Sequence, residues 1–65
     1  MNQPRPFTPE EKLACAKREL QMRQRVYAFR VQTGKMVQAA ADREIALMAA
    51  IVADLETLAA KDRLL

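Results

Sequence analysis

The sequence predicts an all-α fold, an antiparallel, coiled-coil-like two-helix hairpin that dimerises into a four-helix bundle. No proline follows Pro9, and the single glycine, Gly34, falls near the middle of the 65 residues. Apolar residues recur at spacings of three and four on both sides of that glycine, which is typical of helices that pack along one side. Alanine, leucine, glutamate, lysine and arginine are abundant, as they are in long helices.

The start of the chain predicts a flexible arm followed by a capped helix. Residues 1–7 contain Pro4 and Pro6, and each proline disfavours helix in the residue before it. Thr8 and Glu11 have the spacing of a capping box, with Pro9 at the first helical position, where no N–H donor is needed. We therefore expect one helical hairpin over 8–65, whose first helix covers 9–33.

Gly34 predicts the turn between the two helices, because glycine readily adopts the left-handed conformation that ends many helices. We expect a turn over 34–36 and a second helix over 37–61. Val37 offers no capping side chain, so the second helix is expected to begin irregularly. A connection this short makes the two helices antiparallel neighbours.

The second helix carries a wide apolar surface. Its main stripe alternates spacings of four and three and consists of Ala41, Ile45, Met48, Val52, Leu55 and Ala59. Leu47, Ile51 and Leu58 widen the apolar arc to roughly 150°, which is more than one partner helix covers. The second helix is therefore expected to contact at least two neighbours.

The first helix is predicted to carry two apolar sides. One holds Leu13, Ala16, Leu20, Tyr27 and Val31, and the side nearly opposite holds Cys15, Met22, Val26 and Phe29. We predict a hairpin or dimer core of Leu13, Leu20, Tyr27, Val31, Ile45, Met48, Ile51, Val52, Leu55 and Leu58. We predict a partner or dimer interface of Met22, Val26, Phe29 and Cys15, flanked by Arg25 and Arg30. In one interpretation, both sides lie inside a four-helix bundle. In the other, Met22, Val26 and Phe29 stay exposed in the dimer and bind a foreign protein.

The small size of the chain favours self-association. A domain of 65 residues commonly needs disulfides, a metal or oligomerisation to be stable. Cys15 is the only cysteine and histidine is absent, so neither an internal disulfide nor a metal site is expected. We therefore expect a homo-oligomer, in the first instance a dimer, with no cofactor. We find no transmembrane segment or signal peptide, and we expect a cytoplasmic protein that has no membrane partner.

The charge pattern supplies an alternative function. The net charge is +3, and the cations are concentrated in the first helix, whereas the second helix is acidic. A small basic nucleic-acid-binding regulator is therefore an alternative to protein binding. The cations fall on two strips of the first helix instead of one, and the basic region lacks stacking aromatics, which disfavours it. A purely structural oligomer is a third possibility.

No residues of the sequence suggest an enzyme. The chain has no histidine and no serine, and no glycine-rich phosphate loop. Asp42 and Glu44 point in different directions on a helix, so they do not form an acid–base pair. We therefore predict a non-catalytic protein.

The segment from Arg18 to Leu55 resembles a group of small, mostly uncharacterised helical-hairpin proteins encoded by phages and prophages of proteobacteria. The resemblance rests on Arg18-Glu19, Met22-Arg23, Arg25-Val26-Tyr27, Val31, Gly34, Met36, Ala41, Arg43-Glu44-Ile45, Met48 and Ala50-Ile51-Val52. The chain departs from the pattern at Ala28 and Phe29, where relatives tend to show proline and tryptophan nearby, and at Val37, which replaces a capping serine or threonine. The resemblance implies a phage-type accessory protein that binds and modulates a host protein in the host cytoplasm.

Overall fold

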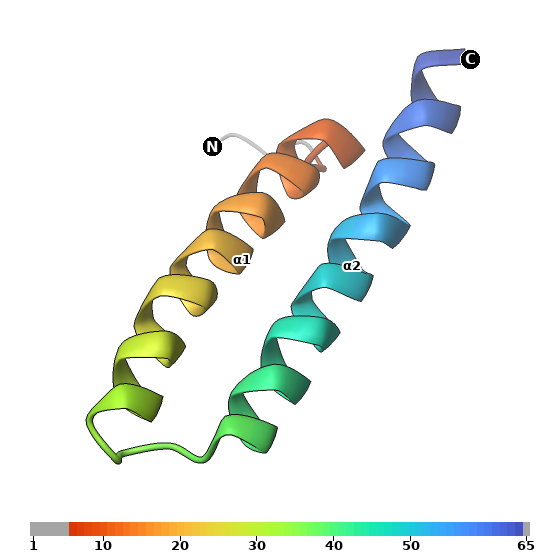
Figure 1. Ribbon diagram of the computed structural model, residues 1–65. Helices are drawn as coiled ribbons and strands as arrows, with labels where there is room; N and C mark the ends of the chain where they lie inside the picture. Colours follow the sequence, from red (N-terminus) through yellow and green to blue (C-terminus); the bar gives the residue numbers. More distant parts are fainter. Residues whose placement is uncertain (1–5, 65) are drawn as a thin grey trace, which may run out of the picture.

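The structure, a computed structural model, describes residues 6–64. Over that range it consists of two helices, α1 (Pro9–Gln32) and α2 (Gln38–Leu64), with no strand. The helices run antiparallel and pack against each other, joined at one end by a short turn (Figure 1). The predicted all-α two-helix hairpin is confirmed. Of the predicted arm over 1–7, residues 1–5 lie outside the described residues, and Pro6 and Phe7 are exposed and precede α1.

α1 begins at a complete capping box. The Thr8 hydroxyl oxygen accepts a hydrogen bond from the N–H of Glu11 at 3.1 Å. The Glu11 carboxylate accepts one from the N–H of Thr8 at 2.8 Å. These reciprocal bonds satisfy two N–H groups that have no partner within the helix, and Pro9, which follows Thr8, has no N–H to satisfy.

α1 ends in a Schellman motif centred on Gly34. Gly34 has a φ of 75°, in the left-handed region. Its N–H donates to the Val31 carbonyl at 3.1 Å, and the N–H of Lys35 donates to the Arg30 carbonyl at 2.7 Å. The predicted first helix ran to residue 33, whereas α1 ends at Gln32 and Thr33 is its C-cap. Gly34 is therefore the residue that stops the helix, as expected.

α2 differs from the predicted 37–61 at both ends. Val37 stays outside the helix, and its carbonyl accepts from the N–H groups of both Ala40 and Ala41 at 3.1 Å. This shared acceptor gives the first turn a tighter, 3₁₀-like bond beside the α-helical one. At the other end the helix continues to Leu64 instead of stopping at 61, because no glycine or proline interrupts it. The added turn carries Arg63, whose guanidinium bonds the Glu10 carboxylate at 3.0 Å across the helix pair.

The hairpin core is a narrow stripe along the contact between the helices. The buried residues of α2 are Ala41, Met48, Val52 and Ala59, and Ile45 and Leu55 of the same stripe are half-buried. All six are members of the stripe expected from the sequence. α1 contributes the buried Ala16, with Leu13 and Leu20 packed against the same cluster. No large side chain among residues 6–64 is completely buried, so the core is thin.

The molecule is an elongated single layer. Its Cα trace is 46 Å long and only 13 Å thick. The radius of gyration is 15.3 Å, whereas a compact domain of this length has about 11 Å. Because no second layer of helices covers the pair, each helix has its outer surface open to solvent.

Candidate functional site

Large apolar side chains stay exposed on both helices. On α2, Leu47, Ile51 and Leu58 are 48%, 42% and 46% exposed. On α1, Met22 and Phe29 are 45% and 63% exposed. Single exposed apolar residues are common in folded proteins, so the question is whether these residues form one continuous surface.

Helix geometry places these residues on the same side of the hairpin. Successive residues of a helix are rotated by about 100°. Val26, Met22 and Phe29 lie roughly 100° to 160° around α1 from the side packed on α2, in the direction opposite to that in which the chain winds. Ile51, Leu58 and Leu47 lie roughly 80° to 120° around α2, turning in the same sense. Because α2 runs opposite to α1, equal senses of rotation on the two helices lead to one side of the pair. We call this surface the apolar face; it consists of Cys15, Met22, Val26, Phe29, Leu47, Ile51 and Leu58.

The opposite side of the hairpin carries ion pairs between the helices. Lys17 and Glu56 approach to 3.7 Å, and Arg63 and Glu10 to 3.0 Å. All four residues are rotated from the packed side in the sense opposite to that of the apolar face. Both pairs are more than half exposed, so each contributes little to stability. Charged residues lie on both sides of the hairpin, because Glu19, Arg23 and Arg30 line one groove with Met22 and Val26. What distinguishes the apolar face is that large exposed apolar side chains from both helices lie on it.

Arg23 interrupts the apolar contact between the helices at its border with the apolar face. Its guanidinium donates to the Glu19 carboxylate at 3.0 Å and to the backbone carbonyl of Glu44 at 3.1 Å. A carboxylate oxygen of Glu44 lies 3.6 Å away. The hydrogen bond to Glu19 is the main cause that raises the pKa of Arg23. Because this pKa is raised, the stabilisation from the charged guanidinium is lost only when the pH rises through the pKa. Arg23 therefore stays charged throughout the physiological range.

The sequence analysis did not predict this position of Arg23 between the helices. Leu13, Ala16, Leu20 and Tyr27 leave a gap in the alternation of three and four, and position 23 fills that gap. Continuing the spacing through the polar residue would have placed Arg23 between the helices.

A second arginine of α1 contacts an aromatic ring. The guanidinium of Arg30 lies 5.7 Å from the centre of the Tyr27 ring, within cation–π range.

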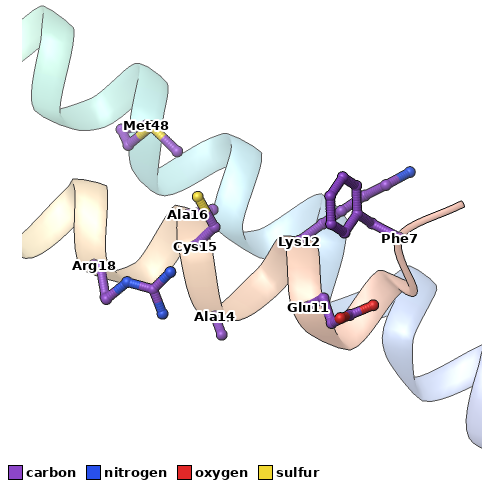
Figure 2. Close-up of a pocket in the computed structure, with 8 residues that line it drawn as sticks. All are labelled: Phe7, Glu11, Lys12, Ala14, Cys15, Ala16, Arg18 and Met48. Atoms are coloured by element: carbon purple, nitrogen blue, oxygen red, sulfur yellow. The ribbon is translucent and has the colours of Figure 1, made fainter. Parts of the chain in front are cut away.

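Two shallow grooves run along α1. The larger, of about 660 Å³, is lined by Phe7, Glu11, Lys12, Ala14, Cys15, Ala16, Arg18 and Met48 (Figure 2). In Figure 2 the Cys15 sulfur is directed to the side on which Met48 of α2 lies. The second groove, of about 350 Å³, includes Met22, Val26 and Arg30. Both are open and mostly apolar in lining, which suits contact with another helix more than enclosure of a small molecule.

The predicted core residues divide into two groups in the single hairpin. Leu13, Leu20, Tyr27, Val31, Ile45, Met48, Val52 and Leu55 lie buried or half-buried between the helices. Ile51 and Leu58 do not; they are on the apolar face, because they flank the buried stripe of α2 on one side. These two residues therefore take no part in the hairpin core proper.

The four apolar residues of the predicted interface lie on one surface, and five of its six residues are exposed. Cys15, Arg25 and Arg30 are exposed, as are Met22 and Phe29, and Val26 is half-buried. The structure brings Cys15, Met22, Val26 and Phe29 of α1 together on the apolar face with Leu47, Ile51 and Leu58 of α2. Arg25 lies outside the apolar face, on the outer rim of α1.

Within residues 6–64, no three histidine, cysteine, aspartate or glutamate side chains gather closely enough to hold a metal ion. Over the same residues, neither helix is both long and apolar enough to cross a membrane. No family model matches the chain, and no curated protein or solved structure matches it.

Proposed function

We propose that this chain is a non-catalytic interaction protein that pairs with a second copy through the apolar face, forming a four-helix bundle. The observation that carries the proposal is the arrangement of exposed apolar side chains from both helices on one side of a thin hairpin. The opposite side carries two ion pairs between the helices, Lys17 with Glu56 and Arg63 with Glu10. A monomer has no evident use for such a difference between its two sides, because both would face water.

The exposed area of the chain supports pairing. The chain exposes 5332 Å², whereas a compact protein of its mass exposes about 4,200 Å². The difference is about 1,100 Å². A standard protein interface buries about 800 Å² on each partner. One self-contact of ordinary size therefore removes most of the excess surface.

The side of α1 that faces away from α2 carries Phe29 and Arg25, and these residues favour a second candidate function, the binding of a foreign protein. Phe29 is 63% exposed and points almost directly away from α2, so it would lie at the edge of a face-to-face dimer. Arg25 precedes it by one helical turn and is also exposed. An aromatic anchor beside an arginine is a common composition for a binding hot spot. A host protein bound in a phage-type setting is the partner that the sequence resemblance suggests.

The nucleic-acid alternative has weaker support. Three of the six cations of α1 are engaged within the hairpin: Lys17 with Glu56, Arg23 with Glu19 and Glu44, and Arg30 with the Tyr27 ring. A phosphate-binding surface gains affinity from cations that are free to replace counterions. Duplex binding that weakens steeply with salt and is lost on neutralising Arg18, Arg23 and Arg25 would favour this function over protein binding.

Size-exclusion chromatography with light scattering on two matched variants tests the proposed pairing. Ile51→Lys puts a charge on the apolar face, and Ala49→Lys puts the same charge on the exposed, ion-paired side of the same helix. Losing the burial of one isoleucine costs about 1.5–3 kcal/mol, so the dimer dissociation constant should rise about tenfold or more. Ala49→Lys should leave it unchanged. Equal dimer populations in the two variants would refute the apolar face as the pairing surface.

A further inference from the structure

The two helices carry net charges of opposite sign. These charges favour some contacts between the helices of two copies and disfavour others. α1 holds six cations and three glutamates, a net charge of +3. α2 holds three cations and five carboxylates, a net charge of −2. Among residues 6–64, ion contacts between the helices join Lys17 to Glu56, Arg23 to Glu44 and Arg63 to Glu10.

Two symmetric arrangements bring two apolar faces together. A closed dimer has a two-fold axis, and for face-to-face contact that axis lies in the interface, either along the helices or across them. An axis across the helices puts α1 on α1 and α2 on α2, with the two turns at opposite ends of the bundle. An axis along the helices puts α1 of each chain on α2 of the other, with both turns at the same end.

Charge favours the axis along the helices. The arrangement with α1 on α1 places two +3 helices side by side and two −2 helices side by side, which disfavours association. The other arrangement places every basic helix between two acidic ones. All four neighbouring helix pairs are then antiparallel and oppositely charged, as the pair within one chain already is.

Matching along the helix axis supports the same choice. In the ion contacts between the helices, the numbers of the two residues add up to about 70. Residue i of α1 therefore lies at about the same height along the hairpin as residue 70 − i of α2. An axis along the helices preserves height, so Lys12 of one copy stands level with Leu58 of the other. Asp54 and Asp62 lie one turn to either side of Leu58, within reach of a lysine side chain. Met22 of one copy lies at the height of Leu47 of the other, which adds one apolar pair to the charged one.

We propose that two copies of this chain pair about a two-fold axis along the helices, with α1 of each on α2 of the other and both turns at one end of the bundle. This inference rests on the proposed self-pairing through the apolar face and specifies its geometry. It makes the four exposed lysines useful reporters, because Lys35 lies in the turn while Lys12 and Lys61 lie near the open end of the hairpin.

Chemical crosslinking of the unmodified chain tests the arrangement. Equal amounts of ¹⁴N and ¹⁵N chain are unfolded, refolded together and treated with a short amine-reactive crosslinker, and heavy–light peptide pairs then report links between chains. With both turns at one end, the two Lys35 residues are about 15–20 Å apart across a bundle whose helices are spaced 8–10 Å. With the turns at opposite ends, Lys35 lies roughly 40 Å from its counterpart and close to Lys12 or Lys61 of the other chain.

We expect heavy–light Lys35–Lys35 products, and heavy–light products of Lys12 with Lys61. The link between Lys12 and Lys61 within one chain, at the open end of the hairpin, is the control for reactivity. A sample of dimer mass whose heavy–light products join Lys35 to Lys12 or Lys61, or lack Lys35–Lys35, overturns the arrangement but leaves self-pairing intact. A sample of monomer mass overturns the proposed function itself.

Discussion

The guanidinium of Arg23 donates a hydrogen bond to the backbone carbonyl of Glu44, 3.1 Å away on the other helix. This bond places a charged group within an otherwise apolar contact between α1 and α2. A polar group inside a helix contact commonly costs stability and selects one register or one oligomeric state. The position of Arg23, at the border of the apolar face, makes it the residue suited to that role.

Replacing Arg23 by leucine should therefore separate stability from specificity. We expect Arg23→Leu to keep its helix content and to melt at the same temperature as the native chain or higher, because a leucine fits an apolar helix contact. We also expect a mixture of oligomers where the native chain gives one species. Circular dichroism and light scattering measure the two quantities. Arg25→Leu, on the outer rim of the same helix, is the control and should keep the native oligomeric state. Loss of helix in Arg23→Leu would contradict this view of Arg23.

Gly34 is expected to be the most sensitive position in the turn. Its φ of 75° is unfavourable for residues with a side chain, although a Cβ there would meet no atom within 4 Å. Gly34→Ala should thus lower the free energy of unfolding by about 1–2 kcal/mol, through backbone strain alone. Gly34→Asn should cost less, because asparagine tolerates the left-handed region. Urea denaturation of both variants at equal concentration measures the difference, and equal losses would mean that strain at Gly34 is not the cause.

The apolar face should have a centre and a rim. Val26 is rotated roughly 100° from the packed side of α1, toward the second copy, whereas Phe29 is rotated roughly 160°, away from it. We therefore expect Val26→Asp to weaken the dimer and Phe29→Asp to leave its mass unchanged. Sedimentation velocity distinguishes these outcomes. If Phe29→Asp also dissociated the dimer, Phe29 would belong to the centre of the pairing surface and not to its edge, and it would not be available as an anchor for another protein.

The helix boundaries were predictable where short-range chemistry sets them. Thr8 with Glu11, and Gly34 in its left-handed conformation, act over three to five residues, so the start and end of α1 could be inferred to within one residue. The end of α2 could not, because no stop signal follows Lys61 and the helix continues until Arg63 meets Glu10. That contact depends on the packing of two distant segments.

The buried stripe of α2 was also predictable, since its spacing belongs to one helix. The single apolar face was not. Whether Met22 and Leu47 lie on the same side depends on the antiparallel packing of both helices, which neither helix pattern contains. Arg23 was missed for a different reason, because its charge outweighed its position in the spacing.

Sedimentation equilibrium of the unmodified chain, over concentrations from micromolar to millimolar, tests most directly whether the apolar face is covered by a second copy. We expect a mass twice the 7.4 kDa of one chain, with thermal stability that rises with protein concentration. A mass of 7.4 kDa throughout, together with concentration-independent melting and full helix content, would contradict it.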